Sequence, residues 1–69
     1  MKLYEYIVTS THSTEVYKGY RYYKNVKEAK REIGIYGMEL VRLRAVAEDE
    51  YISDDIIDGA KKELLERLI

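Results

Sequence analysis

Apolar and polar residues alternate along three separate stretches of the chain, which is the period-two pattern of β-strands. The first stretch, residues 2–9, has apolar side chains on both faces and predicts a central strand. The polar Ser/Thr segment at residues 9–14 predicts the tip of a hairpin, because short polar side chains favour turns. The second stretch, residues 15–24, completes that hairpin.

The second and third strands are expected to have faces of different chemistry. In residues 15–24 one face has Val16, Lys18, Tyr20, Tyr22 and Lys24, and the other has Tyr17, Gly19, Arg21 and Tyr23. Gly19 inside this strand indicates a bulge or the close approach of another backbone. In residues 38–46, strict alternation predicts that one face packs against a helix, with the side chains of Val41, Leu43 and Ala45. The other face is expected to meet solvent or a partner, with the side chains of Leu40, Arg42 and Arg44.

Apolar residues recur at helical spacing in two further stretches. The first helix is expected over residues 26–36, with Asn25 and Glu28 spaced as in a capping box and Gly37 as its stop. The second is expected over residues 54–68, after an acidic linker at 47–52 and with Ser53 as its N-cap. Its apolar stripe packs either on the chain's own sheet or against a partner, and consists of Ile57, Ala60, Leu64 and Leu68.

These elements predict one α+β domain over residues 1–69, a three-stranded antiparallel sheet with two helices in the order β-β-α-β-α. A chain of 69 residues buries only about 60% of the surface of its unfolded form, and without cysteine it has no disulfide to compensate. Association with a second copy supplies further burial. We therefore expect a homodimer or another protein partner.

Charge is distributed unevenly along the chain. Residues 1–46 contain nine Lys/Arg and five Asp/Glu (net +4), whereas residues 47–69 contain three Lys/Arg and eight Asp/Glu (net −5). The absence of Cys and Gln, with charged residues at 36%, is typical of a thermophilic source. Without a signal-peptide pattern or a long apolar run, we expect a cytoplasmic protein, within the host cell if its source is viral.

The segment Lys18-Gly19-Tyr20-Arg21-Tyr22-Tyr23-Lys24 resembles the first ribonucleoprotein motif of the RNA recognition motif family, K/R-G-F/Y-G/A-F-V-x-F/Y. The matching positions are Lys18, Gly19, Tyr20 and Tyr22, and the departures are Arg21, Tyr23 and Asn25. The expected order of elements also differs from the β-α-β-β-α-β order of that family. The resemblance implies that aromatic rings of the sheet stack on single-stranded bases while Lys and Arg bind phosphates.

A second resemblance covers residues 2–8 and 33–43. The segment Lys2-Leu3-Tyr4-Glu5-Tyr6-Ile7-Val8 is similar to the K-x-[FY]-E-Y-x-V opening of a family of short bacterial and phage domains of unknown function. The segment Gly34-Ile35-Tyr36-Gly37-Met38-Glu39-Leu40-Val41 is similar to that family's G-x-x-G-W-E-L-V turn into a strand, with Met38 in place of Trp. This resemblance implies an antiparallel sheet with one helix packed on it.

The sequence contains no convincing catalytic or metal-binding pattern. His12 lies beside Ser10, Thr11 and Ser13, but a triad needs a third group and an oxyanion hole on a rigid scaffold. A metal site needs several ligands, and the acidic run at 48–58 lacks the glycine spacing of an EF-hand loop. We therefore expect no enzyme activity, no metal and no cofactor.

Two functions remain as hypotheses. The first is a small non-enzymatic interaction module, such as a viral or prophage-type factor, that binds a protein partner and associates with itself. The alternative is binding of single-stranded RNA through a Tyr/Arg/Lys face of the sheet. The candidate binding residues are the same for both: Lys18, Tyr20, Arg21, Tyr22, Lys24, Arg42 and Arg44.

Overall fold

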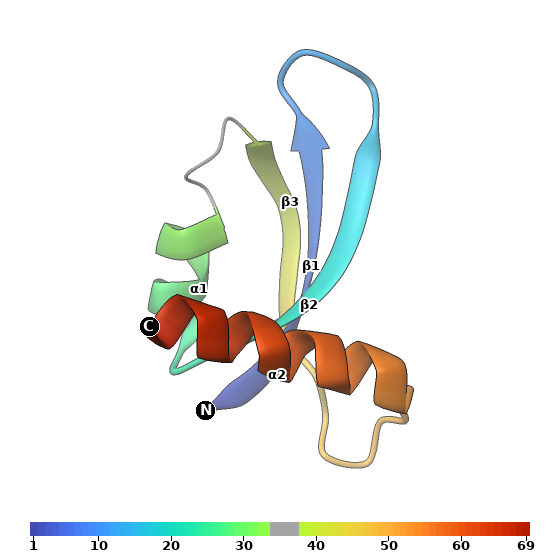
Figure 1. Ribbon diagram of the computed structural model, residues 1–69. Coiled ribbons are helices and arrows are strands. Elements are labelled where there is room, and N and C mark those ends of the chain that lie inside the picture. The colour runs from blue at the N-terminus through green and yellow to red at the C-terminus, as the bar shows by residue number, and fades with distance from the viewer. Residues whose placement is uncertain (34–37) are drawn as a thin grey trace.

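A computed structural model describes residues 1–33 and 38–69 and shows the predicted β-β-α-β-α order (Figure 1). The elements are β1 (Lys2–Ser10), β2 (Val16–Tyr23), α1 (Val26–Ile33), β3 (Met38–Ala45) and α2 (Asp54–Leu68). The antiparallel sheet has the order β2-β1-β3, so β1 is the central strand, as predicted. The expected end of the first helix, including Gly34, Tyr36 and Gly37, lies outside the described residues.

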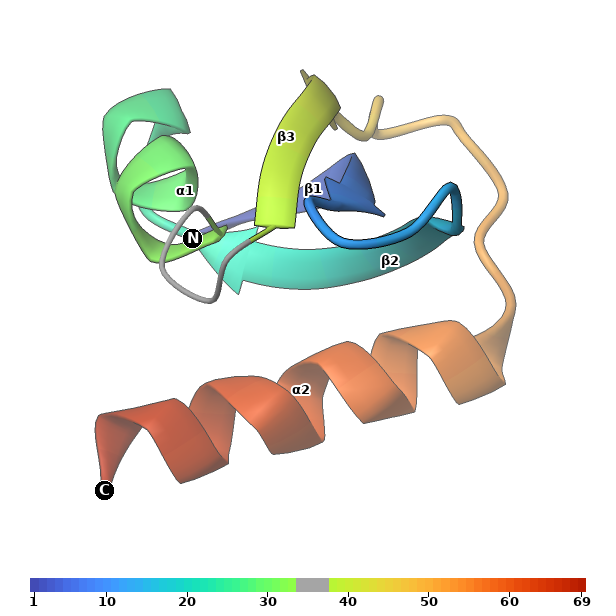
Figure 2. The same cartoon turned by 90° about the horizontal axis from the view of Figure 1, so that it is seen from above.

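The hydrophobic core lies between α1 and one face of the sheet (Figure 2). Tyr4 and Val8 project from β1 toward Ala29 and Ile33 of α1, and Tyr23 joins them from the end of β2. Tyr23 has no exposed surface, and its ring centroid lies 6.4 Å from that of Tyr4. Because the chain has neither Phe nor Trp, tyrosine supplies the aromatic part of this core.

Helix α1 begins with the capping interaction that its sequence predicted. The side-chain oxygen of Asn25 accepts a hydrogen bond from the Glu28 amide at 2.9 Å. The Glu28 carboxylate accepts one from the amide of Lys24 at 2.6 Å, so the return bond reaches the residue before the cap. Both bonds satisfy backbone amides at the start of the helix and fix the angle at which β2 leads into α1.

Strand β3 contains a β-bulge that simple alternation did not predict. Ile7 and Val8 are adjacent in β1, but they pair with Arg42 and Leu40, so Val41 is an extra residue. Leu40 therefore packs against the core on the α1 side, whereas Val41 is 61% exposed. The prediction that Val41 faces the helix and Leu40 faces away is wrong, because period-two counting assumes a strand without insertions.

Helix α2 packs against β2 and crosses the outer edge of the sheet (Figure 2). Within the predicted stripe Ala60 is buried, Ile57 and Leu64 are half-buried and Leu68 is exposed, so most of the stripe packs on the chain itself. Ser53 occupies the N-cap position, but its side chain makes no capping hydrogen bond. Because α2 lies against the end of β2 that leads into α1, it covers that part of the strand's edge (Figure 1).

The last turn of α2 is held to β2 by one arginine. Arg67 donates a hydrogen bond to the backbone carbonyl of Tyr22. Its guanidinium carbon also lies 4.2 Å from the centroid of the Tyr23 ring, which is a cation–π arrangement. Arg67 further pairs with Glu63 one turn earlier in α2, at 3.0 Å. Through its contacts with Tyr22 and Tyr23, Arg67 links the helix to both the backbone and the core of the sheet.

Gly19 makes room for an aromatic ring and not for a bulge or a second backbone. The register of β1 and β2 runs through Gly19 without a shift and places it opposite Tyr6. A Cβ atom at position 19 would overlap the Tyr6 ring, whose Cε1 is 2.9 Å from the position of that atom. The centroid of the same ring lies 5.5 Å from the guanidinium carbon of Arg21. The Tyr6 ring therefore occupies the space over Gly19 and beside Arg21.

The Gly19→Ala variant tests this arrangement. Alanine is ordinarily the better strand residue, but here its methyl group displaces the Tyr6 ring, so we expect a loss of roughly 1–2 kcal/mol in the free energy of unfolding. In a Tyr6→Ala background the same change should be neutral or stabilising. Urea denaturation of the four proteins of this cycle measures both effects, and an equal effect of Gly19→Ala in the two backgrounds would contradict the assignment.

Candidate interaction surface

Five of the seven predicted binding residues share the sheet face opposite α1. The pairing places Lys18, Tyr20 and Tyr22 of β2 on this face, beside Arg42 and Arg44 of β3. The two remaining predicted residues lie elsewhere. Lys24 is exposed just beyond the end of β2, and Arg21 lies on the α1 face opposite Tyr4.

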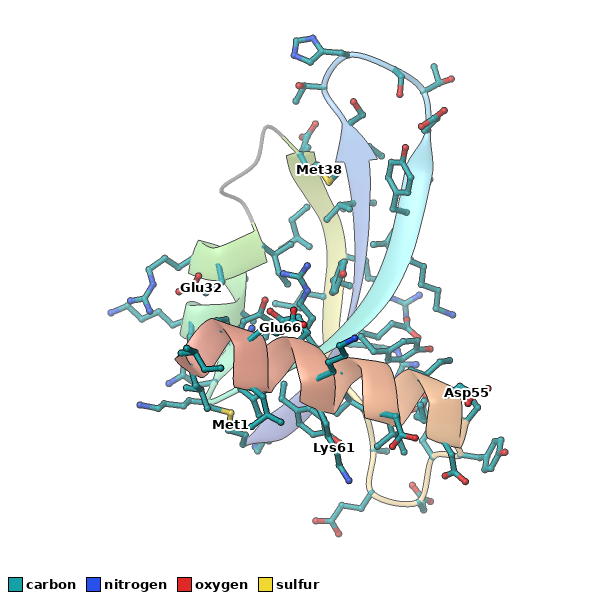
Figure 3. All side chains as sticks on the ribbon, viewed as in Figure 1. Met1, Glu32, Met38, Asp55, Lys61 and Glu66 are labelled. Atoms are coloured by element: carbon teal, nitrogen blue, oxygen red, sulfur yellow. The ribbon has the colours of Figure 1, made fainter. Side chains whose placement is uncertain are left out.

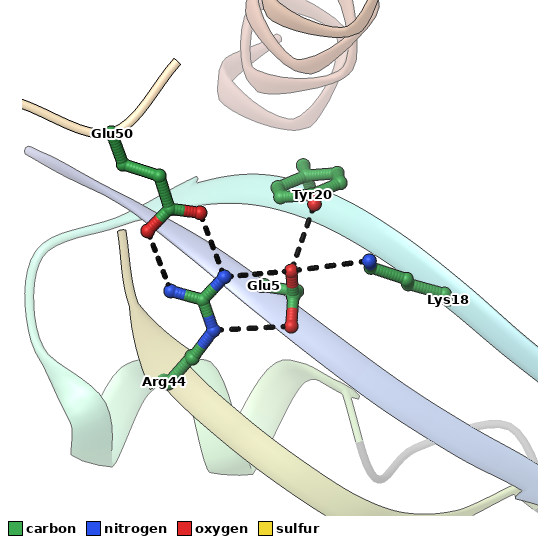
Figure 4. A network of polar contacts seen from close by, with 5 residues as sticks. All are labelled: Glu5, Lys18, Tyr20, Arg44 and Glu50. Atoms are coloured by element: carbon green, nitrogen blue, oxygen red, sulfur yellow. Dashed lines mark hydrogen bonds and ion pairs between the residues drawn. The ribbon is translucent and has the colours of Figure 1, made fainter. Parts of the chain in front are cut away.

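A buried carboxylate lies among the five residues, and the sequence analysis did not include it. Glu5 projects from the central strand onto this face and is only 5% exposed. Arg44 contacts both of its oxygens, at 3.1 Å through Nε and at 2.9 Å through Nη2. The Tyr20 hydroxyl donates a hydrogen bond to it at 2.8 Å, and the Lys18 ammonium lies 3.4 Å away (Figure 4). Three of the expected binding residues are therefore partners of Glu5.

The second side of Arg44 is occupied by the linker that follows β3. Its two terminal nitrogens donate hydrogen bonds to the two oxygens of Glu50, each at 2.7 Å. This paired geometry matches the fork of a guanidinium to the plane of a carboxylate. Arg44 therefore connects β1, β3 and the linker, and four hydrogen bonds to the two carboxylates occupy most of its donors.

These contacts shift the ionisation of the groups that make them. The hydrogen bonds from Arg44 and then Tyr20 lower the pKa of Glu5 from 4.5 to about 2, although burial acts in the opposite direction. The hydrogen bond from Arg44 also lowers the pKa of Glu50. The bonds to Glu50 and Glu5 raise the pKa of Arg44, so all three groups remain charged near neutral pH.

A signal for this network is present in the sequence, but it depends on strand register. Glu5 is the only acidic residue in the predicted strand at residues 2–9, and the other two predicted strands each contain basic residues. Once the register places Glu5 opposite Tyr20 and Arg44, the network follows from cross-strand pairing. The bulge in β3 decides which arginine meets Glu5, and that bulge was not predicted.

The half of this face nearer to the hairpin loop shares only Lys18 with the network. We define the open sheet face as Ile7, Val16, Lys18 and Arg42. Ile7 is half-buried and lies between Lys18 on β2 and Arg42 on β3. Val16 is 63% exposed, and both α1 and α2 lie away from this part of the sheet (Figure 1). The open sheet face is thus a small apolar centre flanked by two cations.

Other kinds of site receive no support within residues 1–33 and 38–69. No three His, Asp or Glu side chains in these ranges are grouped to hold a metal ion. Neither of the two helices there has the length and apolar character needed to cross a bilayer. His12, which belongs to the hairpin loop, has its backbone amide bonded to the hydroxyl of Ser10 at 3.2 Å, a local turn contact.

Comparison of the chain with protein-family models, with curated proteins and with solved structures found no match. The fold class is therefore defined by the structure alone as a three-stranded α+β domain. Function has to be argued from the surfaces that this domain presents.

The Glu5 network predicts a specific dependence of stability on pH. Because the pKa of Glu5 is about 2 in the folded chain and 4.5 when unpaired, its contribution is complete above pH 4.5 and is lost as the pH falls toward 2. Glu5→Gln should lower the free energy of unfolding at pH 7 by about 2 kcal/mol and flatten its pH dependence between those limits.

Urea denaturation at a series of pH values measures this difference. Glu48→Gln is the matched control, because Glu48 is an exposed glutamate of the linker, and it should retain the wild-type profile. Equal pH profiles for Glu5→Gln and the wild type would show that Glu5 does not stabilise the folded sheet through its charge.

Proposed function

We propose that this chain is a small non-enzymatic interaction module that binds a protein partner through the open sheet face. The observation that carries this proposal is the neutralisation of the expected nucleic-acid contacts by Glu5 and Glu50. Arg44, Lys18 and Tyr20 all direct polar atoms at these carboxylates. The exposed groups that remain are a mixture of apolar side chains and single cations.

Binding of RNA through this face would carry two costs. Arg44 already binds Glu5 and Glu50 at hydrogen-bond distance. A phosphate that approached Arg44 would therefore have to displace one of these carboxylates. The carboxylate of Glu5 also places a negative charge beside Tyr20, where a stacked base would bring its phosphates. Affinity for nucleic acid rests on unopposed cations near the backbone, and this face offers few of them.

The chemistry of the open sheet face agrees with a protein contact. Interfaces combine an apolar centre with a polar rim and are enriched in arginine and tyrosine. Ile7 and Val16 supply apolar surface here, and Lys18 and Arg42 flank it on the two neighbouring strands. A complementary partner presents an apolar side chain with acidic residues on both sides of it.

A charge placed on the open sheet face tests the proposal. Val16→Asp should abolish capture of the partner by the tagged chain after cross-linking in its own cells, because it adds an unpaired carboxylate to the apolar centre. Val26→Asp is the matched control. Val26 is similarly exposed, at 47%, but lies at the start of α1, where an acidic residue suits the helix dipole.

The same preparation tests the alternative function. Fluorescence anisotropy with labelled single-stranded RNA at low salt should show no binding that depends on Tyr20, Tyr22 or Arg42. If RNA is bound and replacement of these three residues by Ala removes the binding, the protein-interaction proposal is wrong and the RNA alternative holds. A partner that is captured equally by Val16→Asp and Val26→Asp would also contradict the use of this face.

A further inference from the structure

The two edges of the sheet differ in how they are covered. Helix α2 lies on the outer side of β2 over part of that strand, but none of the described segments lies beyond β3 on its outer side (Figure 2). Of the backbone hydrogen bonds that the described residues form outside regular helices and strands, none involves Met38–Ala45. Such an edge presents unpaired amide and carbonyl groups that can pair with another strand.

The bulge gives β3 a symmetric arrangement of faces. Before the bulge, Met38 and Leu40 are opposite Ser10 and Val8, on the α1 side. After the bulge, it is the odd-numbered positions 43 and 45 that lie on that side, opposite Tyr6 and Tyr4. In a regular strand of eight residues the first and last side chains project to opposite faces, whereas in β3 they project to the same face.

This symmetry permits one particular self-pairing. When two β3 strands overlap antiparallel over their full length, residues whose numbers sum to 83 are opposite each other. Met38 then meets Ala45 and Leu40 meets Leu43, all on the α1 side. On the other side Glu39 meets Arg44 and is diagonal to Arg42, within the reach of long cross-strand side chains. Two of the four pairs thus match apolar residues and one matches an acid with a base, while Val41 meets Arg42 next to the two-fold axis.

We propose that the open edge of β3 pairs with the same edge of a second copy and forms a continuous six-stranded sheet. This inference goes beyond the proposed function, because it concerns the sheet edge and not the open sheet face. The pairing is isologous and uses the open edge of both copies. Since α2 covers part of the β2 edge in each copy, around Tyr22, that edge is less open than the β3 edge, and pairing through β3 favours a closed dimer.

Charge complementarity selects the second copy as the occupant. Arg42 is exposed, and no hydrogen bond or ion pair joins it to another residue of the described ranges. Glu39 is exposed in the same way on the same side of β3. Two-fold pairing brings Glu39 of each copy diagonal to Arg42 of the other, so these two exposed charges come within reach of an opposite charge. Met38, at the hairpin end of β3, is also partly exposed and gains apolar contact (Figure 3).

A charge exchange between two variants tests the dimer. In Glu39→Lys and in Arg42→Glu, both cross-strand pairs become like-charged, so each protein alone should dimerise at least roughly tenfold more weakly than the wild type in analytical ultracentrifugation. In an equimolar mixture both Glu39–Arg42 diagonals are again opposite in charge, so the mixture should dimerise more tightly than either variant alone. The recovery also shows that the two variants are folded.

Two further measurements make the result decisive. Amides of β3 should exchange with deuterium more slowly as the protein concentration rises, while those of the hairpin loop should not change. Leu65→Ser should leave the dimer intact, although Leu65 on α2 is 64% exposed and offers a competing surface.

Three results would overturn the β3 dimer: a wild-type monomer at millimolar concentration, an unchanged dimer in both charge variants, or a dimer lost in Leu65→Ser. Because Arg42 belongs to both surfaces, the open sheet face is tested separately through Val16, which lies on β2 and away from the β3 edge. A chain that is monomeric but captures its partner through Val16 separates the two proposals.

Discussion

The Glu5 carboxylate is the constraint on which the rest of the sheet depends. A buried charge is tolerated only when opposite charges and hydrogen-bond donors surround it, and here these come from both neighbouring strands. A slip of β1 by one residue would turn Glu5 toward the apolar core beneath α1. The Glu5 contacts to Tyr20 and Arg44 therefore specify the register of all three strands, and not only a local ion pair.

The same constraint shapes the surface that remains. Because Arg44 is shared between Glu5 and Glu50, the linker after β3 is drawn to the sheet at the start of its path toward α2. The helix then reaches the edge of β2, where Ala60 packs inward and Arg67 contacts Tyr23. The positive charges that the sequence suggested for binding a ligand instead connect the strands, the linker and the helix.

Sequence reasoning predicted interactions between residues close in the chain and missed interactions between strands. The capping bonds of Asn25 and Glu28 and the limits of α2 depend on residues close in the chain, and they were predicted. The Glu5 network and the bulge at Val41 depend on which residues face each other across strands, and spacing alone does not determine this. The predicted surface kept its location, but a single unpredicted register shift and one acidic residue changed its chemistry.

The bulge also changes what the exposed edge of β3 can pair with. In a regular eight-residue strand, full antiparallel overlap of two copies would set core-facing side chains against solvent-facing ones, which opposes self-pairing. The extra Val41 removes that mismatch. Leu40 before the bulge and Leu43 after it project to the same face of the sheet. A feature that usually disrupts an edge thus makes the faces of β3 compatible with those of its own copy, while α2 covers part of the β2 edge.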